Sequence, residues 1–429
     1  MKLHPHQVKL LEMTRCLKRV AYFIDMGLGK TYIAPEKMFE IGNRLNLLIC
    51  QKSKVSDWVS HFNVYYPEKV IVVDYTKKEN QELTILDMVK LSASLTVVII
   101  VNYELAWRRP ELSKLTGFTL ILDESSMIQN YSAKQSRFIV KKLHEDACIL
   151  LSGTPVGGKF ENLWTQSEML GCGLTKKQFE DRFINFETLN LGMRSVRIVD
   201  RKNPYKHIDE LKEILRFAGA VFMKTEEVMT LPEQRIIEIE CNSTKAYRTF
   251  LKDKVVEVEG KELIGNSSFS MRLAFRMLAS QYSESKLERF KELIESTSDR
   301  VIVFYNFNEE LRKMRVICEK LGRPVSVING AEKDLSNYNS EEDSVTLVQY
   351  QAGAMGLNLQ KANKMIYFSL PERSELFEQS KKRIHRIGQK SSCTYYILES
   401  RGTIDKAIYQ ALRRKQDYTD ELFKQDFKL

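Results

Sequence analysis

The stretch Val20-Ala-Tyr-Phe-Ile-Asp-Met-Gly-Leu-Gly-Lys-Thr31 joins an apolar run to a glycine-containing turn, and a helical pattern follows it. Glycines let consecutive backbone N–H groups converge on phosphate oxygens, and the first turn of a helix adds partial positive charge. In such a loop Lys30 would reach the β- and γ-phosphates of a nucleotide, and the Thr31 hydroxyl would bind Mg²⁺. The stretch therefore predicts a strand, a phosphate-binding loop and a helix. The loop residues are Met26, Gly27, Leu28 and Gly29.

The loop does not follow the strict GxxxxGK[ST] pattern, because Ile24 stands at the first glycine position. A plain glycine turn before a helix would explain the triplet Gly-Lys-Thr equally well. A second feature favours phosphate binding: the apolar run from Phe118 ends in Asp123 and Glu124. Phosphoryl transfer to water needs a held magnesium ion and a group that orients the water. We therefore predict that Asp123 binds the metal and Glu124 activates the water.

Short apolar runs recur along both halves of the chain, with helical patterns between them. This alternation predicts an α/β fold with two lobes, each a mainly parallel sheet flanked by helices. We place the lobe boundary at Thr230, so the expected lobes are residues 1–229 and 230–429, with helical insertions at about 158–225 and 243–298. The expected strands of the first half are 45–50, 70–74, 96–101, 118–123 and 147–151, and those of the second half are 300–305, 324–328, 344–349, 364–368 and 393–398.

Composition excludes several classes of protein. The chain has 429 residues, of which 43% are hydrophobic and 28% charged, so it is neither fibrous nor largely disordered. Its seven cysteines include no CxxC pair, which argues against a zinc cluster and for a reducing compartment. No apolar run is long enough for a membrane span, and no secretory signal begins the chain. We expect a cytoplasmic protein without a membrane partner. The net charge of +10 is compatible with a polyanionic partner.

The second half contains the stretch Gln379-Ser-Lys-Lys-Arg-Ile-His-Arg-Ile-Gly-Gln389. Arg383 and Arg386 are three residues apart, so on a helix they would share a face. Two guanidinium groups suit a γ-phosphate whose charge is spread over three oxygens in the transition state. A basic surface helix is the alternative. Residues 381–415 hold ten Lys or Arg and two acidic residues, which also suits a phosphate backbone.

A strand ending in a glycine-containing loop precedes this stretch. It reads Val348-Gln-Tyr-Gln-Ala-Gly-Ala-Met-Gly-Leu-Asn-Leu359 and includes Gln351 and Gly356. Glycines permit close approach of the backbone to a ligand. The loop could therefore contact either a nucleotide or a phosphate backbone.

Taken in order, these motifs resemble helicase superfamily two, and within it the Swi/Snf-type DNA-translocating ATPases. The motifs are Gln7, Asp25-Met-Gly-Leu-Gly-Lys-Thr31, Asp123-Glu124, Leu151-Ser-Gly-Thr-Pro155 and Gln379 to Gln389. The segments Phe222–Pro232 and Gly402–Tyr409 also resemble that family. The resemblance covers nearly the whole chain and is closest to compact bacterial or phage members. It implies two RecA-like lobes that hydrolyse ATP between them and move along DNA.

The resemblance also implies roles for residues. Gln7 would recognise adenine, and Gln379, Arg383 and Arg386 would serve catalysis together with Lys30 and Glu124. ATP and Mg²⁺ are the expected cofactors, and the expected partner is DNA, mainly duplex, bound by a monomeric core. A nuclease or replication partner is conceivable, but the sequence identifies none. The expected nucleic-acid contacts are Ser53, Lys54, Asn102, Tyr103, Tyr305, Asn306 and Gln351.

The sequence departs from the family's usual motifs at two places. Ser126 stands where relatives usually have His, and Tyr350-Gln351 stands where many have Thr-Arg. Two alternatives to the duplex motor remain open. One is a helicase that separates strands, for which a hairpin at 186–205 could act as a wedge. The other is a nucleic-acid-binding adaptor that binds ATP without hydrolysing it.

Overall fold

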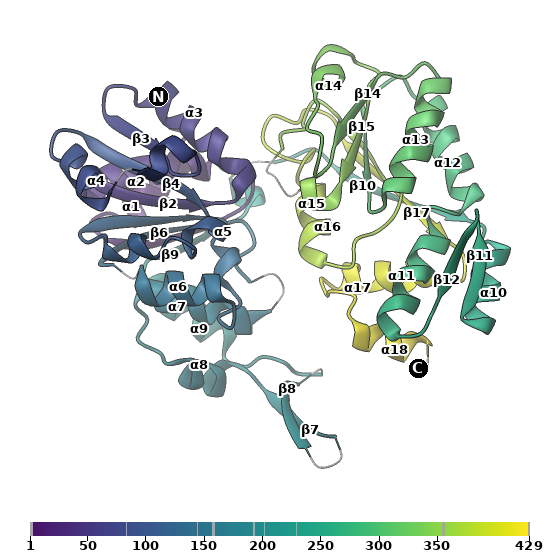
Figure 1. Cartoon of the computed structure of the whole chain (residues 1–429), viewed down its shortest axis with the longest axis horizontal. Helices are drawn as coiled ribbons and strands as arrows, with labels where there is room; N and C mark the ends of the chain where they lie inside the picture. Colours follow the sequence, from purple (N-terminus) through teal and green to yellow (C-terminus); the bar gives the residue numbers. More distant parts are fainter. Residues whose placement is uncertain are drawn as a thin grey trace. The chain divides into compact units, whose positions relative to one another are not determined.

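The chain forms two compact units, residues 1–229 and residues 230–429. The computed structural model describes residues 3–427, except for 83, 144, 157–158, 192–193, 201, 229 and 354–356. Gly356, one of the predicted nucleotide contacts, lies outside the described residues. Figure 1 shows a sheet with helices packed around it in each unit.

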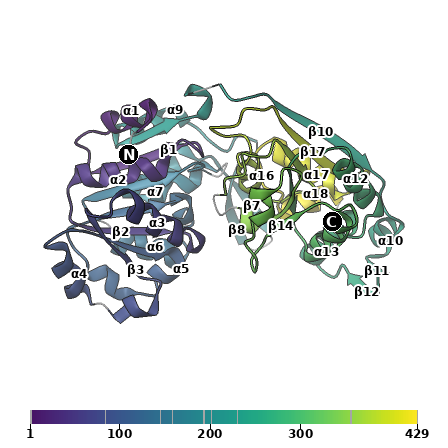
Figure 2. The same ribbon diagram turned by 90° about the horizontal axis from the view of Figure 1, so that it is seen from above.

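Unit 1 is built on a seven-stranded sheet in the order β3-β4-β2-β5-β6-β1-β9, and all its pairings are parallel. Its central strands are buried on both faces, as the continuous apolar runs predict. Figure 2 shows β1 and β3 toward opposite ends of this sheet. The strands are β1 (Arg19–Ile24), β2 (Leu45–Cys50), β3 (Val70–Asp74), β4 (Thr96–Asn102), β5 (Phe118–Asp123), β6 (Ala147–Ser152) and β9 (Ala220–Met223).

Helices cover both faces of this sheet, which gives the three-layered α/β arrangement expected from the sequence (Figure 1). The five strands expected in the first half are all present, whereas the edge strand β9 was not predicted. The helices are α1 (Pro5–Met13), α2 (Lys30–Ile41), α3 (Val55–Tyr65), α4 (Ile85–Ser92), α5 (Tyr103–Ala106), α6 (Lys134–Lys142), α7 (Trp164–Leu170), α8 (Lys176–Phe183) and α9 (Ile208–Phe217).

The insertion between β6 and β9 is not purely helical. Besides α7, α8 and α9 it contains an antiparallel hairpin of β7 (Phe186–Leu191) and β8 (Arg194–Val199), which projects from the unit in Figure 1. Ile184 and Tyr205 pair across the base of this hairpin. Short alternating strands of this kind lack the continuous apolar runs that made the central strands recognisable in the sequence.

Unit 2 contains a six-stranded sheet in the order β10-β17-β16-β13-β15-β14, also parallel throughout. All five strands expected in the second half occur, and the alternating segment after Thr230 forms β10. The predicted fold class, two lobes with mainly parallel sheets, is therefore confirmed. The strands are β10 (Gln234–Cys241), β13 (Val301–Tyr305), β14 (Val325–Ile328), β15 (Val345–Gln349), β16 (Lys364–Tyr367) and β17 (Cys393–Ser400).

Alternate residues of the unit 2 strands fill two cores, one on each face of the sheet. Ile302 and Phe304 of β13 belong to one core, and Val301, Val303 and Tyr305 to the other. A hairpin of β11 (Val255–Val258) and β12 (Lys261–Ile264) interrupts the insertion that was expected to be helical. The helices are α10 (Lys245–Asp253), α11 (Ser268–Ala279), α12 (Glu284–Glu295), α13 (Asn308–Lys320), α14 (Ser336–Ser340), α15 (Tyr350–Gly353), α16 (Ser374–Lys381), α17 (Ile404–Arg413) and α18 (Asp420–Phe427).

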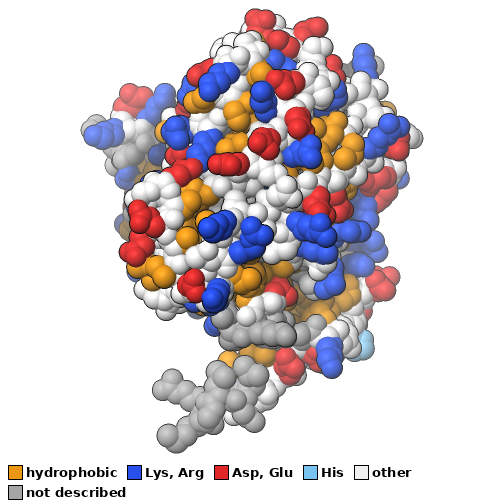
Figure 3. Space-filling view, turned by 90° about the vertical axis from the view of Figure 1, so that its right-hand side faces the viewer, with side chains coloured by type: hydrophobic (Ala, Val, Ile, Leu, Met, Phe, Trp, Pro, Cys, Tyr) orange, Lys and Arg blue, Asp and Glu red, His pale blue; other side chains and the backbone are white. Residues whose placement is uncertain are grey.

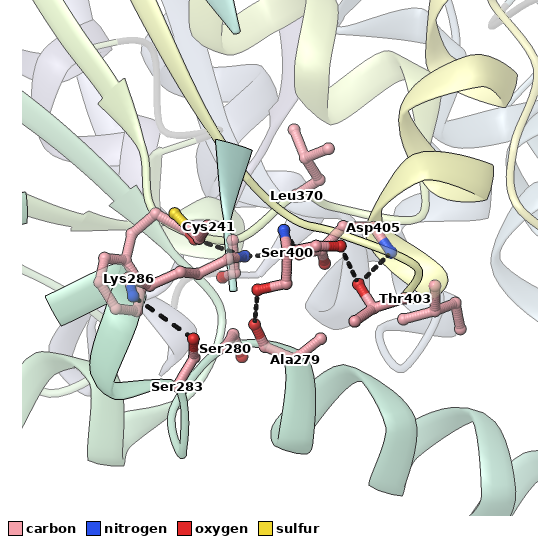
Figure 4. A network of polar contacts seen from close by, with 12 residues as sticks. Cys241, Ala279, Ser280, Ser283, Lys286, Leu370, Ser400, Thr403 and Asp405 are labelled. Atoms are coloured by element: carbon pink, nitrogen blue, oxygen red, sulfur yellow. Dashed lines mark hydrogen bonds and ion pairs between the residues drawn. The ribbon is translucent and has the colours of Figure 1, made fainter. Parts of the chain in front are cut away.

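A buried ion pair ties α12 to α17 inside unit 2. Lys286 is fully buried, and its Nζ lies 2.7 Å from Oδ2 of Asp405, which is 5% exposed. Lys286 Nζ also donates to the Phe368 carbonyl, and the same Asp405 oxygen accepts the Ser400 N–H. Figure 4 shows Lys286, Ser400 and Asp405 close together among the helices and the end of β17. Such a pair is tolerated in an apolar interior because each charge has further hydrogen bonds.

Among the described residues, no helix is both long and apolar enough to cross a bilayer.

Candidate functional site

The predicted loops of unit 1 meet at one edge of its sheet. Strands β5, β6 and β1 are neighbours, and all three run in the same direction. Their carboxyl ends therefore bring the loops after Ile24, Asp123 and Ser152 together. Strands β4 and β2 follow on the other side of β5, so the loops after Cys50 and Asn102 extend the same edge.

Left-handed glycines shape the phosphate loop. Gly27 has φ +91°, and Gly29, which directly precedes helix α2, has φ +80°. A Cβ on Gly29 would lie only 2.1 Å from Gln7 Nε2, so this position excludes larger residues. Gln7 is buried, and its Nε2 donates to the Leu28 carbonyl over 3.3 Å. Helix α1 thus holds the loop through the glutamine that the resemblance assigns to adenine recognition.

Lys30 begins helix α2 and turns back over the loop. Its Nζ donates to the carbonyls of Ile24 and Asp25, over 2.8 and 3.3 Å. These backbone acceptors keep the ammonium at the end of β1. Gly153 lies against the other side of the Lys30 side chain. A Cβ at this glycine would lie 3.4 Å from Lys30 Nζ and 3.2 Å from Met26 Cγ. The Ser152–Pro155 loop therefore packs directly on the phosphate loop.

Asp123 is held by a tryptophan from a different helix. Trp58 of α3 donates its Nε1–H to Asp123 Oδ2 over 2.8 Å. Burial raises the pKa of Asp123, and the Trp58 hydrogen bond and the charges of Lys54 and Lys30 oppose this shift. Trp58 is not part of any motif recognised in the sequence. No sequence signal connects it to Asp123, because the two residues are 65 positions apart.

Glu124 lies in a left-handed conformation, with φ +59° and ψ +60°, immediately after β5. This is uncommon for a residue with a side chain and turns the chain sharply at the end of the strand. The hydroxyl of the fully buried Tyr103 donates to the Asp123 carbonyl over 3.0 Å and to that of Glu124 over 3.4 Å. Burial also raises the pKa of the Tyr103 phenol well above its usual value. Tyr103 therefore supports the backbone of the carboxylate loop.

Asp25, the residue directly before the phosphate loop, contacts the last segment of unit 1. The Thr225 N–H and hydroxyl both donate to Asp25 Oδ2, over 3.1 and 3.2 Å. The Asp25 N–H donates to the Met223 carbonyl of β9. Thr225 lies in the segment that leads from β9 to the unit boundary, so the nucleotide loop and this segment share a direct contact.

The oxygen donors at this edge fit Mg²⁺. Thr31 lies in the first turn of α2 and Asp123 at the end of the nearby strand β5, and both offer hard oxygen ligands. Mg²⁺ typically uses one or two carboxylates together with substrate phosphates and water. The described residues contain no group of three His, Cys, Asp or Glu that could hold a metal by themselves. The donor set therefore suits a metal that arrives with a nucleotide.

The predicted arginines of unit 2 do not share a helix face. Helix α16 ends at Lys381, and the residues after Lys382 form turns, so the prediction of one helix carrying both Arg383 and Arg386 is wrong. Two turn hydrogen bonds, Arg383 N–H to Ser380 and Gln389 N–H to Arg386, hold this segment. Gln379 remains inside the helix and donates to Glu375 over 3.0 Å. Glycine at 388 with φ +94° requires the chain to turn there.

Both arginines are held close to the protein body. Arg383 is 3% exposed, and its carbonyl accepts the Leu359 N–H. Burial lowers the pKa of the Arg386 guanidinium, which nevertheless stays charged because the usual value is so high. Gln389 fixes the far end by donating to the carbonyls of Gln360, Ala362 and Ile384. The segment is a series of turns that holds the buried Arg383 and the partly buried Arg386.

The predicted nucleic-acid contacts differ in exposure. Ser53 and Lys54 are partly exposed, and Lys54 pairs with Asp57. Gln351 is exposed, and Asn306 is partly exposed and donates to Ser369 and Leu370. Asn102 is 7% exposed, and the side chains of Tyr103 and Tyr305 are fully buried. The two tyrosines could therefore offer only neighbouring backbone to a ligand. The face of unit 2 in Figure 3 intersperses Lys and Arg with Asp and Glu.

A loop with left-handed glycines, a carboxylate pair and a small-residue loop meet at one edge of a parallel sheet, the edge at which open α/β proteins bind their ligands. The SNF2-related domain family matches residues 21–297, and the helicase conserved C-terminal domain matches residues 285–388. The first match covers more than half of the chain, and the chain belongs to the SNF2-related family. The Swi/Snf resemblance seen in its motifs is confirmed.

The individual relatives share only low sequence identity with this chain. The chain is 24% identical to a Bacillus subtilis protein named as an ATP-dependent helicase/translocase (YwqA), with 94% of this chain and 46% of the relative covered. It is also 24% identical to a Xenopus tropicalis SWI/SNF-related regulator of chromatin, subfamily A-like protein 1, with 91% and 42% covered. The chain thus spans less than half of either relative. A Sulfolobus solfataricus SWI2/SNF2 ATPase core solved with dsDNA shares 20% sequence identity with this chain. The match covers 99% of this chain and 92% of the Sulfolobus chain, with a TM-score of 0.46.

Proposed function

We propose that this chain is an ATP-dependent DNA motor that hydrolyses the β–γ phosphoanhydride of ATP and translocates on DNA, mainly duplex. The observation that carries the proposal is the convergence of the phosphate loop, Asp123–Glu124 and the Ser152–Pro155 loop at one edge of unit 1. Membership of the SNF2-related family supports it.

In this proposal the loop amides of residues 26–29 and the Lys30 ammonium bind the phosphates. Lys30 would exchange its two carbonyl acceptors for phosphate oxygens, which gain more from a full positive charge. Thr31 and Asp123 would hold Mg²⁺, which supplies charge neutralisation of the transferring phosphoryl group. Glu124 would orient the attacking water and take its proton.

Unit 2 would supply the remaining catalytic groups. Arg383 and Arg386 are proposed to stabilise the charge that develops on the transferring phosphate, with Gln379 beside them. Gln7 is proposed to contact adenine, and Gly356 the nucleotide. The proposed DNA contacts are Ser53, Lys54, Asn102, Asn306 and Gln351, together with backbone next to Tyr103 and Tyr305. We propose a monomeric core working in the cytoplasm of a bacterial or phage-infected cell.

The test is steady-state ATP hydrolysis with no nucleic acid, with single-stranded DNA, with blunt duplex DNA and with RNA. The inactive control is Lys30→Ala, and Glu124→Gln should bind ATP without turning it over. Strong stimulation by duplex DNA alone would support the motor. Stimulation that persists unchanged at high salt would contradict tracking on the backbone, because phosphate contacts release counterions. Absence of hydrolysis under all conditions would favour the ATP-gated adaptor.

One observation favours strand separation as a second candidate function. The β7–β8 hairpin projects from unit 1, and its described residues Glu187, Thr188, Ser195, Val196 and Arg197 are exposed. An isolated two-stranded hairpin is marginal in water, so a projecting one needs a reason to be kept. Replacing residues 187–198 by an Asn-Gly turn should abolish strand displacement if the hairpin is a wedge. Unchanged displacement would exclude that function for the hairpin.

A further inference from the structure

A buried glutamine joins two loops of the nucleotide edge. Gln166 of helix α7 is fully buried, and it lies between Ser125, which follows Glu124, and Pro155 of the Ser152–Pro155 loop. The Ser125 hydroxyl donates to Gln166 Oε1 over 2.8 Å, and Gln166 Nε2 donates to the Pro155 carbonyl over 2.8 Å. One side chain therefore bonds both loops at once.

The orientation of this amide follows from its partners. The Pro155 carbonyl can only accept a hydrogen bond, so the NH₂ group of Gln166 must face it. The Gln166 carbonyl then faces Ser125, whose hydroxyl must donate. Ser125 is also fully buried, so neither group can exchange its partner for water. Breaking either bond would leave a buried polar group unsatisfied, which makes the bridge stiff.

The Pro155 carbonyl also accepts a hydrogen bond from a second side chain. Gln129 Nε2 donates to the same Pro155 carbonyl over 2.9 Å, and Asn162 Nδ2 donates to Gln129 Oε1 over 3.3 Å. Gly153, two residues before Pro155, packs against Met26 and Lys30 of the phosphate loop. The contacts thus run from the phosphate loop through the Ser152–Pro155 loop and Gln166 to Ser125.

We propose that Gln166 is a positioning residue that couples the phosphate loop to Glu124. Ser125 directly follows Glu124. Because the backbone of Glu124 is left-handed, the direction of the Glu124 side chain depends on how the neighbouring residues are held. A shift of the Ser152–Pro155 loop is transmitted through Gln166 to Ser125 and so reorients the Glu124 carboxylate. The inference rests on the proposed ATP hydrolysis, because it assigns to Gln166 the placement of the water-activating group.

The test compares kcat and KM for ATP, with saturating duplex DNA, in Gln166→Met, Ser125→Ala and the double variant. Gln166→Met keeps the side-chain volume and removes both hydrogen bonds. We expect kcat to fall about fivefold or more, as for coupling between sites. KM should stay within about twofold, because the phosphate loop itself is intact. The double variant should be no worse than the worse single one, since groups that act as one unit are not additive.

Thr165→Val is the matched control. Thr165 precedes Gln166 in the same helix, is 1% exposed, and its hydroxyl makes no hydrogen bond within the described part of the chain. It should leave kcat and KM unchanged. Wild-type kcat in a folded Gln166→Met protein would overturn the proposal, and so would additive losses in the double variant. If Gln166→Met does not fold, Ser125→Ala carries the same test by its own kcat.

The two proposals fail separately. If the wild-type chain hydrolyses no ATP while Lys30→Ala behaves identically, the proposed function fails. If the wild type hydrolyses ATP and Gln166→Met and Ser125→Ala match it, only the role of Gln166 fails.

Discussion

Two lysines place their ammonium groups in very different surroundings. Lys30 in unit 1 donates to two backbone carbonyls at the partly exposed edge of the sheet. Lys286 in unit 2 is fully buried against Asp405 and the Phe368 carbonyl. A ligand phosphate can replace weak neutral acceptors at an edge, but it cannot reach a charge that is already neutralised inside a core. The comparison shows that the partners of a lysine decide whether it can serve chemistry or only stability.

The largest expected effect is the loss of the interior pair. Lys286→Met leaves Asp405 as an uncompensated buried charge, and we expect the free energy of unfolding of unit 2 to fall by about 3–5 kcal/mol. Chemical denaturation followed by circular dichroism measures this loss. The double variant Lys286→Met/Asp405→Leu should recover part of the stability. A single variant as stable as the wild type would contradict the structural role of Lys286.

The edge lysine should behave in the opposite way. Lys30→Met removes the positive charge facing the phosphates, and we expect ATP turnover to fall about 100-fold or more. The denaturation midpoint should stay close to the wild-type value, because the carbonyls of Ile24 and Asp25 lie at the partly exposed edge of the sheet, where water can replace the ammonium. Steady-state hydrolysis and thermal melting of the same preparation measure both quantities. Retained turnover would remove Lys30 from the proposed site.

Two glycines, one at each end of helix α2, separate the effect of a contact with Gln7 from the effect of backbone strain. Both Gly29 (φ +80°) and Gly42 (φ +85°) are left-handed, but only Gly29 lies against Gln7. Gly29→Ala should weaken ATP binding about tenfold, because the new Cβ displaces Gln7 and the loop. Gly42→Ala has open space around its Cβ, so it should cost only stability, about 1–2 kcal/mol. Binding of a fluorescent ATP analogue and melting separate the two effects. Equal effects of the two variants on binding would show that backbone strain alone is responsible.

The smallest effect concerns a buried histidine of unit 1. Burial lowers the pKa of His61 to about 4, since its ring packs among Tyr32, Trp58 and Tyr65. In the unfolded chain an imidazole titrates near 6.5, so it takes up a proton first as the pH falls. Stability is therefore lost as the pH falls from about 6.5 toward 4.

Replacing His61 should make the free energy of unfolding depend less strongly on pH in the acid range. We expect His61→Phe to lower the acid midpoint of unfolding by about half a pH unit. Urea denaturation at pH 7, 6, 5 and 4 measures the change. His207→Asn is the control, because His207 is exposed in a left-handed turn. An unchanged pH dependence in His61→Phe would mean that other groups dominate acid unfolding.

The central strands and the unit 1 site loops were predictable because their signals are local. Continuous apolar runs specify buried parallel strands, and a parallel sheet brings their carboxyl ends to one edge. The strand ends at Ile24 and Asp123 therefore followed from the sequence, and the predicted end at Leu151 lies one residue before the observed end at Ser152. The edge strand β9 and the β11–β12 hairpin were missed, and the hairpin at 186–205 entered only with the helicase alternative, since short strands with mixed faces have no such run.

The sequence by itself determined the α/β class, the phosphate loop and the carboxylate pair, because each depends on short runs of consecutive residues. Only the tertiary structure decided which side chains support them. Trp58 on Asp123, Gln166 between Ser125 and Pro155, and Thr225 on Asp25 join residues 11 to 200 positions apart. It also placed Arg383 and Arg386 in a turn instead of a helix. Such contacts depend on how elements pack, and the periodicity of one segment carries no information about its neighbours in space.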